Sequence, residues 1–504
     1  MAQCGVRTKP SIYESRAMVA NSEVVSSSDA AEIERLHRVF ETQQKSFVED
    51  GEPDLKTRQD RISRVIAMIV RNADKFGDAA HADYGSRDPQ LAKAIDMAGV
   101  VDWLKHDRKT TAKFIRGERR PSTFPLGLLG GRSRVHYEPL GVIGNISPWH
   151  FPVQLSFSML GAAFGAGNRV IIKPSDQTPH TSQAIAEAVS EYFDETELAA
   201  FAGGFDLAVA FPKLPFDHLM FTGSPALAKI ISAEAAKNLT PVTLELGGKS
   251  PVIVGSSADL TEATRRIMWG KVLNGGQVCL APDYGFIPAG SESEFIEAAD
   301  RVVSDMFPTM VDNDQYVSFV NDRHYQRVKN YIDDARAKGA RIVEVNPAGE
   351  QFPDTARKMP VTFVLGVTED MVIAREEIFG PVFLIRTYSD LTEAIEYINA
   401  RPKPLALYYF GEDNAEWRTV LDRTSSGGAV KNDVIVHVMQ HDLPFGGVGN
   451  SGSGRYHGIE GFRRLSNPRS VYEQSNIAAK ALRLALNFPM TDLQNKILKT
   501  KLRE

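Results

Sequence analysis

Hydrophobic positions along this chain follow two different spacings. Two runs near the start have apolar residues at helical intervals: Ile33, Leu36, Val39, Phe40 and, later, Ile62, Val65, Ile66 and Ile69. From Arg134 the pattern changes to short apolar strands that alternate with amphipathic helices, such as the helix expected over 226–237. This order predicts a helical start followed by a parallel sheet wrapped by helices.

The alternation of strands and helices begins again after Gly247. It predicts a second unit of similar size, and therefore an α/β fold with two doubly wound parallel sheets. The apolar stretch 151–170 is broken by polar residues and glycines, so we expect a core helix there and no integral membrane segment. Residues 476–504 predict a helical tail that is interrupted at Pro489.

Composition and charge narrow the class of protein. With 504 residues, the chain exceeds one small domain, since a domain averages roughly 150 residues. Hydrophobic residues make up 43% and charged residues 24%, as is typical of folded globular proteins. The formal net charge is −5, whereas nucleic-acid-binding modules usually have a basic excess. We therefore expect no nucleic-acid partner.

The cysteines and the N-terminus indicate the compartment. Cys4 and Cys279 are the two cysteines, so the chain can form at most one disulfide and cannot hold a four-cysteine zinc site. A reducing compartment is the default, and we expect a cytoplasmic location. The first residues lack the apolar core of a secretory signal, and the Ser-rich stretch predicts a disordered arm over residues 1–29.

Three short patterns match known phosphate- or metal-binding motifs, but the sequence around each pattern argues against that function. Residues 447–452 read GVGNSG, which matches G-x-G-x-x-G, but they do not follow a strand. Residues 247–250 read GGKS, yet Thr243 stands where a phosphate loop has its first glycine. His437 and His441 have a zinc-compatible spacing, but no glutamate follows His437. We expect no phosphate-binding fingerprint and no metal site from these patterns.

Cys279 and Glu245 stand in unusual surroundings. Cys279 follows Gly275 and Gly276, which permit tight backbone turns and expose an N–H near the sulfur. Glu245 lies in an apolar strand that leads into two glycines, where its carboxylate would be partly desolvated. From spacing alone, a buried inert cysteine is the better interpretation of Cys279. The plain alternative for Glu245 is a strand-end residue paired with a lysine.

Seven sequence windows are more specific together than any of them alone. They are WHFP at 149, KPSDQTP at 173, FTGSP at 221, LELGGKSP at 244, GQVCLAPDY at 276, EEIFGPV at 376 and LPFGGVGNSGSGRYHG at 443. This set resembles the aldehyde dehydrogenase superfamily, in its order and approximate spacing, from Ala30 to about Ser475. NDVIVH and LPFGGVGNSG look like class 3 of the family, and the stretch FVEDGEPDLKTRQDRISRVIAMI is similar to its coniferyl aldehyde dehydrogenase branch.

The resemblance implies a division of the chain into parts. They are an NAD-binding domain (30–133 and 142–246), a catalytic domain (247–438), bridging segments (134–141 and 439–475) and the C-terminal tail (476–504). The strands VHYEPLG and SVYEQS would form a small oligomerisation sheet, and class 3 members are expected to be homodimers. For the tail, we favour packing in the oligomer over a membrane-surface anchor.

The resemblance also implies the reaction. Cys279 would be the nucleophile, and its thiohemiacetal would give up a hydride to the cofactor and become a thioester. Glu245 would be the base that activates water for hydrolysis of this thioester, and partial burial would raise its pKa toward the working pH. The product would be the carboxylic acid.

Three pairs of residues resemble the cofactor-binding positions of the family. They are Lys173 and Asp176 for the adenosine ribose, Gly223 and Ser224 for the pyrophosphate at a helix N-terminus, and Glu377 and Phe379 for the nicotinamide ribose and ring. An acidic side chain at Asp176 opposes a 2′-phosphate. The resemblance therefore favours NAD and leaves NADP possible.

Two residues depart from the family pattern. His150 in WHFP occupies the place of an asparagine whose amide donates to the oxyanion, and Ala228 the place of a glycine near the cofactor. An imidazole can donate an N–H, so His150 is a candidate catalytic residue. The methyl group of Ala228 would weaken NAD binding modestly.

We therefore predict an NAD(P)-dependent aldehyde dehydrogenase. Its substrate is expected to be an aromatic aldehyde, such as coniferaldehyde or benzaldehyde, or a medium-chain aliphatic aldehyde. One alternative is a catalytically impaired protein that binds NAD or scavenges aldehydes, because His150 and Ala228 both differ from the family pattern. Another is acyl transfer to coenzyme A, which the retention of Glu245 as hydrolytic base opposes.

Overall fold

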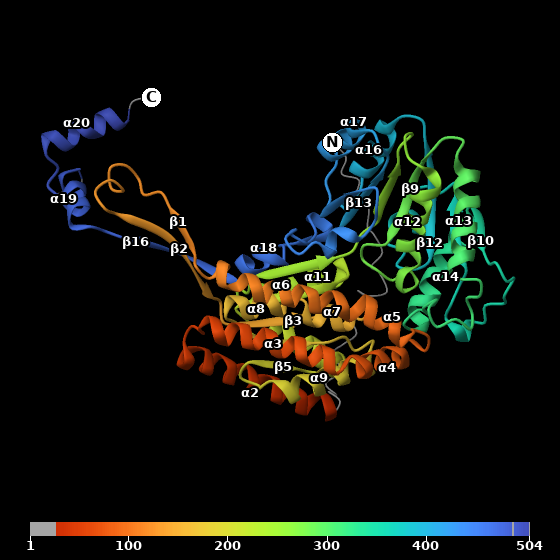
Figure 1. Ribbon diagram of the computed structural model, residues 1–504, viewed down its shortest axis with the longest axis horizontal. Coiled ribbons are helices and arrows are strands. Elements are labelled where there is room, and N and C mark those ends of the chain that lie inside the picture. Colours follow the sequence, from red (N-terminus) through yellow and green to blue (C-terminus); the bar gives the residue numbers. More distant parts are fainter. Residues whose placement is uncertain (1–26, 486–487, 503–504) are drawn as a thin grey trace, which may run out of the picture.

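The computed structural model describes residues 27–485 and 488–502. The arm predicted over residues 1–29 lies outside the described residues except for its last three, which begin the first helix, and Cys4 lies outside them as well. The described residues form three sheets, of six, seven and three strands (Figure 1).

A group of helices opens the described chain, as the apolar spacing predicts. They are α2 (Ser27–Asp50), α3 (Leu55–Arg71), α4 (Ala73–Tyr84), α5 (Pro89–Lys93), the π-helical turn η1 (Ala94–Ala98) and α6 (Gly99–Phe114). The Asp54 side chain caps α3 by accepting a hydrogen bond from the Thr57 backbone N–H. Gly85 ends α4 with a φ of 74°. Most of the predicted apolar positions, including Leu36 and Val65, are buried.

The six-stranded sheet has the order β15-β7-β6-β3-β4-β5. Its strands are β3 (Val142–Ile146), β4 (Arg169–Lys173), β5 (Leu198–Ala200), β6 (His218–Gly223), β7 (Val242–Leu246) and β15 (Gly452–Ser453). Strands β3 to β7 pair in parallel, and β15 pairs antiparallel with β7 at the edge. The helices between them are α7 (Pro152–Phe157), α8 (Leu160–Ala166), α9 (Pro179–Tyr192), α10 (Phe205–Ala210) and α11 (Pro225–Ala236).

The stretch 151–170 differs from the prediction of one core helix. It forms the two short helices α7 and α8 and the start of β4. Gly167 adopts a φ of 99° and ends α8, so the chain can turn directly into β4. Among the described residues, no helix combines the length and the apolar character needed to cross a membrane.

The seven-stranded sheet has the order β10-β11-β12-β9-β8-β13-β14. Its strands are β8 (Ser250–Val254), β9 (Pro282–Pro288), β10 (Arg341–Val345), β11 (Val361–Leu365), β12 (Val382–Tyr388), β13 (Ala406–Phe410) and β14 (Gly428–Lys431). Pairing is parallel except at the edge between β10 and β11. The helices of this part are α12 (Leu260–Val272), α13 (Glu292–Met306), α14 (Asp322–Ala337), α15 (Val372–Arg375), α16 (Leu391–Asn399) and α17 (Asn414–Arg423).

The three-stranded antiparallel sheet extends away from the two larger sheets (Figure 1). It consists of β1 (Glu118–Arg120), β2 (Arg132–Pro139) and β16 (Ser466–Glu473), and α18 (Gly458–Arg464) leads into β16. The tail helices α19 (Asn476–Ala485) and α20 (Asp492–Lys501) lie at its far end. The small sheet expected from VHYEPLG and SVYEQS is confirmed, and β1 is a third strand that the sequence did not indicate.

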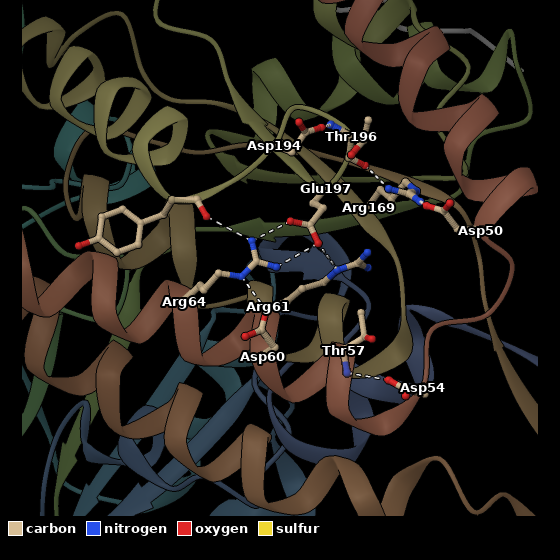
Figure 2. Close-up of polar contacts among 11 residues, drawn as sticks. Asp50, Asp54, Thr57, Asp60, Arg61, Arg64, Arg169, Asp194, Thr196 and Glu197 are labelled. Carbon is tan, nitrogen blue, oxygen red and sulfur yellow. Dashed lines mark hydrogen bonds and ion pairs between the residues drawn. The ribbon is translucent and has the colours of Figure 1, made fainter.

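Ion pairs connect the helical start to the six-stranded sheet (Figure 2). The carboxylate of Glu197, directly before β5, accepts hydrogen bonds from Arg61 Nε at 2.9 Å and Arg64 Nη1 at 2.7 Å, both on α3. Arg169, at the start of β4, pairs with Asp50 at the end of α2. Because the Arg61 and Arg169 side chains are almost fully buried, their partners also offset the cost of burying two positive charges.

Candidate active site

Glu245 and Cys279 lie beside each other, the first on a strand of the six-stranded sheet and the second shortly before a strand of the seven-stranded sheet. Glu245 belongs to β7, where it pairs with Thr222 of β6 and with Gly452 of β15. Cys279 lies in the turn between the short helix η3 (Leu273–Gly276) and β9, and it is half-buried. The thiol and the carboxyl are close enough to shift each other's pKa. The structure thus brings the predicted nucleophile and the predicted base together.

The Glu245 carboxyl is poised to exchange a proton. Only 2% of the residue is exposed, and neither carboxyl oxygen has a hydrogen-bond partner among the described residues. Burial raises the pKa of Glu245 to about 8, the Cys279 thiol opposes this shift, and the Glu377 carboxyl adds to it. Burial and the carboxyls of Glu245 and Glu377 raise the pKa of the Cys279 thiol well above its usual value. A buried, unpartnered carboxyl that titrates near neutral pH suits a general base.

Tight backbone turns place Cys279. Asn274, Gly275 and Gly276 all have positive φ, at 50°, 63° and 73°. A Cβ on Gly276 would overlap the carbonyl of Gly380, so the position requires glycine for space as well as for conformation. The prediction that these glycines permit a tight turn before Cys279 is confirmed.

Glu377 approaches the end of β7 closely. A Cβ on Gly247 would overlap both carboxylate oxygens of Glu377, and burial raises the pKa of Glu377 to about 7. Lys249 holds this segment, because its Nζ pairs with Asp283 and donates to the carbonyl of Glu376 at 3.0 Å. The sequence did not predict these contacts of Lys249. Lys249 belongs to the GGKS pattern that we rejected, and nothing in the sequence indicates that Asp283 reaches it.

His150 lies among aromatic rings near Phe379. The two ring centroids are 5.3 Å apart and the rings are perpendicular. The residue is almost fully buried, and its Nε2 has no hydrogen-bond partner within the described part of the chain. Burial and the charge of Arg87 lower the pKa of His150 to about 3, so the ring is neutral near pH 7. Asn274 Nδ2 fixes the backbone here by donating to the His150 carbonyl at 3.0 Å.

Lys173 is the last residue of β4, and Asp176 follows three residues later. The buried Lys173 Nζ donates to the carbonyls of Pro174 at 2.7 Å and Gly203 at 3.1 Å. Burial lowers the pKa of Lys173, and the negative charge of Asp176 opposes that shift. Asp176 itself is exposed. Since an ammonium group has three donors, Lys173 can bind one further acceptor at the strand end.

Gly223 and Ser224 lead from β6 into α11. Ser224 is the exposed N-cap, and its hydroxyl accepts from the Leu227 backbone N–H at 3.3 Å. Ala228, one of the two departures from the family pattern, is buried in the core under this helix. Exposed large apolar residues occur on α10 and α11: Phe205, Val209, Leu227 and Ile230. Sequence reasoning did not single them out, because their exposure depends on the packing of both helices.

The rejected patterns have other surroundings in the structure. Residues 447–452 run through the short 3-10 helix η6 (Gly449–Ser451) into β15, which pairs with β7, and they do not lead from a strand into an α-helix. His441 stacks on His106 with centroids 5.1 Å apart, whereas His437 lies against Phe445 at 6.0 Å. Across residues 27–485 and 488–502, no group of three or more His, Cys, Asp or Glu side chains could hold a metal ion.

Comparison with known proteins identifies the family. The profile of the aldehyde dehydrogenase family matches residues 11–471, and the chain belongs to this family. It is 46% identical to the coniferyl aldehyde dehydrogenase of Pseudomonas sp. strain HR199 over 450 residues, which are 89% of this chain and 93% of the relative. Of solved structures, substrate-bound AldH of Staphylococcus aureus has a TM-score of 0.85 and 32% identity, covering 93% of this chain and 99% of that chain. An aldehyde dehydrogenase of Mycobacterium tuberculosis complexed with NAD+ has a TM-score of 0.76 and 27% identity, covering 87% and 89%.

Family membership settles the class of reaction. The chain is an oxidoreductase that oxidises aldehydes with NAD or NADP. The α/β fold with parallel sheets that the sequence predicts is confirmed. Nothing in the comparisons favours the catalytically impaired alternative.

Proposed function

We propose that the chain converts an aromatic aldehyde, such as coniferaldehyde or benzaldehyde, or a medium-chain aliphatic aldehyde, to the carboxylic acid. Cys279 is the nucleophile and Glu245 is the base. The observation that carries this assignment is the buried, unpartnered carboxyl of Glu245 beside the half-buried thiol of Cys279. The preference for an aromatic aldehyde is supported by the similarity to a coniferyl aldehyde dehydrogenase and by the aromatic rings around His150.

The first half of the reaction forms the thioester. The Cys279 thiol is neutral near pH 7 because its pKa is raised, so its proton must pass to a base, and the Glu245 carboxylate is in place to accept it. The sulfur then bonds to the carbonyl carbon, and the carbonyl electrons move to the oxygen. When this oxyanion re-forms its double bond, a hydride leaves the carbon and a thioester remains on Cys279. NAD or NADP, when bound, supplies the hydride acceptor.

The second half releases the acid. Glu245 first releases to solvent the proton that it took from Cys279, and its carboxylate then takes a proton from a water molecule, whose oxygen attacks the thioester carbon. The carbon–sulfur bond breaks, Cys279 leaves as the thiolate, and the carboxylic acid departs. This step requires the ionised form of Glu245, and burial raises the pKa of Glu245 to about 8, so only a fraction is ionised at pH 7.

Two donors stabilise the oxyanion in this proposal. They are the backbone N–H of Cys279 and the neutral imidazole of His150. His150 replaces the asparagine of the family pattern, and its neutrality leaves one ring N–H to donate. The unpartnered Nε2 of His150 supports this role, since a buried ring nitrogen without a partner is costly unless it serves a ligand.

The cofactor lies across the carboxyl ends of the parallel strands in this proposal. Lys173 and Asp176 hold the adenosine ribose, with one Lys173 donor still available for it. Gly223 and Ser224 place the N-terminus of α11 at the pyrophosphate, and Glu377 with Phe379 holds the nicotinamide ribose and ring. The exposed apolar side chains of α10 and α11 suit the flat faces of an adenine ring. The acidic Asp176 favours NAD over NADP.

We also propose the division into parts that the sequence predicts. Residues 30–133 and 142–246 form the NAD-binding domain and 247–438 the catalytic domain. Among the described strands, β16 lies at an edge of its sheet, and apolar side chains of the tail such as Ile477, Leu493 and Leu502 are exposed, which supports a homodimer that covers them. The Cys279 thiol forms no disulfide within the described residues, and the chain can form at most one, which favours the cytoplasm.

The test is NADH formation by purified protein with NAD and a panel from acetaldehyde and hexanal to benzaldehyde and coniferaldehyde. We expect turnover that is fastest with aromatic aldehydes and that disappears in Cys279→Ala. Turnover that survives in Cys279→Ala would contradict the assignment of the nucleophile. Formation of acyl-CoA on addition of coenzyme A would favour acyl transfer over hydrolysis by Glu245.

A further inference from the structure

Gln177 connects the two large sheets by its side-chain amide. It follows Asp176 in the segment after β4, and its Oε1 faces the start of α14. Three donors reach this one oxygen: Asn321 Nδ2 at 3.3 Å, Arg323 Nη2 at 2.8 Å and His324 Nε2 at 3.0 Å. A single acceptor thus joins the segment assigned to the adenosine ribose to a helix of the seven-stranded sheet.

The chemistry of the donors fixes the orientation of this amide. A guanidinium can only donate, so the atom that faces Arg323 must be the amide oxygen and not the amide nitrogen. Burial and the charges of Arg327 and Arg323 lower the pKa of His324 to about 3, so its ring is neutral and must carry its one hydrogen on Nε2 to donate to Gln177. Replacing the oxygen by an apolar atom would therefore leave several donors without their acceptor.

The same helix supports the nicotinamide end of the site. Arg327, one turn after His324, donates from Nη1 to the carbonyl of Glu377 at 3.1 Å and from Nη2 to the carbonyl of Ile378 at 2.8 Å. The next residue, Phe379, has a φ of 52°, which is strained for a bulky side chain. Such a conformation persists only where neighbouring groups hold it, and Arg327 holds the two carbonyls that precede it.

The Trp149 ring provides a second connection between α14 and Phe379. The Trp149 ring lies 4.7 Å from the His324 ring and 5.3 Å from the Phe379 ring, measured between centroids. The orientation of His324, which its bond to Gln177 fixes, is therefore also transmitted to Phe379 through packing. Both paths begin at Gln177 and end at the residues assigned to the nicotinamide.

We infer that Gln177 is a positioning residue that couples the adenosine half of the cofactor site to Glu377 and Phe379 through the start of α14. The inference rests on the proposed roles of Lys173, Asp176, Glu377 and Phe379. If Gln177 acted only locally at the ribose, its loss would weaken binding of the adenosine half of the cofactor. The coupling predicts instead that the effect of losing Gln177 appears at the opposite end of the cofactor.

Binding of two ligands by the full-length protein separates these roles. Gln177→Met keeps the length of the side chain and removes the acceptor oxygen, whereas Gln177→Glu retains it. By titration calorimetry, we expect Gln177→Met to weaken NADH binding by about 3- to 10-fold, as for the loss of one or two hydrogen bonds. Binding of ADP-ribose, which lacks the nicotinamide, should change by less than about twofold, since Lys173 and Asp176 are untouched.

Two control variants, one at Gln177 and one at a distant glutamine, accompany this experiment. Gln177→Glu should bind NADH within about twofold of the parent protein, since the acceptor is retained. Gln183→Met, on the exposed face of α9, where Gln183 contacts Glu187, should change neither affinity. Equal weakening of NADH and ADP-ribose, or no weakening of NADH, would overturn the coupling. If the parent protein binds neither ligand, the proposed cofactor site itself is wrong and the inference falls with it.

Discussion

Gly452 pairs with Glu245 across the edge of the six-stranded sheet. Gly452 has a φ of 146°, and a Cβ there would overlap the carbonyl of Leu244. Gly447 and Gly452 of GVGNSG thus serve close approaches between backbone segments. The last part of the chain in this way supports the strand that carries the proposed base.

Replacement of Gly452 by alanine tests this support. The added methyl group meets the β7 backbone and must be accommodated at a φ that side chains rarely adopt, so we expect a loss of about 1–3 kcal/mol in unfolding free energy. The kcat should also fall, because β7 carries Glu245. Thermal unfolding and steady-state rates measure the two effects. Gly99→Ala, with an ordinary helical φ of −61° and no atom within 4 Å of the added Cβ, is the control and should be neutral or slightly stabilising.

Glu245→Gln should separate the two halves of the reaction. Hydrolysis loses its base in this variant, whereas the Cys279 thiol loses a neighbouring carboxyl that raises its pKa and can then give its proton to solvent, so we expect one equivalent of NADH in an early phase followed by slower turnover. The steady-state rate should fall by about 10²- to 10⁴-fold. Stopped-flow absorbance measures both phases. A steady-state rate like that of the parent protein would remove Glu245 from the mechanism.

The pKa of Glu245 also predicts a pH dependence. Because burial raises the pKa of Glu245 to about 8 and the base acts in its ionised form, kcat should rise with pH and level off above about pH 8. Stability should move the opposite way: a carboxyl whose folded pKa exceeds its unfolded value of 4.5 favours the folded state at low pH, and this contribution is lost as pH rises from 4.5 through 8. Glu245→Gln should flatten both profiles, and a kcat profile that keeps its rise in this variant assigns the limb to another group.

His150 offers a direct test of the oxyanion proposal. His150→Ala removes the proposed side-chain donor and should lower kcat by about 10²- to 10³-fold, whereas His150→Asn restores the amide of the family pattern and should retain most of the rate. Because burial lowers the pKa of His150 to about 3, neither variant should alter the shape of the pH profile between pH 5 and 9. An undiminished kcat in His150→Ala would show that the backbone N–H of Cys279 suffices.

Sequence patterns predicted the parts of the site that depend on residues adjacent in the chain. They did not predict the parts that depend on packing between distant segments. The turn before Cys279 and the strand that contains Glu245 follow from glycines and apolar residues that are neighbours in the chain. The pairing of Lys249 with Asp283 joins residues 34 positions apart, and Gln177 reaches α14 from 144 positions away or more. The first contact depends on the pairing of β8 with β9 and the second on how the two sheets meet, and no local spacing encodes either of them.

The ion pairs of Figure 2 give a matched prediction on stability. Glu197→Gln leaves the almost fully buried Arg61 without a charged partner, and we expect a loss of about 2–3 kcal/mol, as for charged hydrogen bonds of a partly exposed carboxylate. The neighbouring Glu195 pairs with Arg35 on the surface, so Glu195→Gln should cost less than about 1 kcal/mol. Burial alone would raise the pKa of Glu197, but Arg64 and Arg61 hold it below its usual value, so this contribution is present at neutral pH and disappears as pH falls through that pKa. Chemical denaturation of both variants at pH 7 and at pH 4 measures the difference, and equal losses for the two glutamates at pH 7 would contradict a structural role for the buried pair.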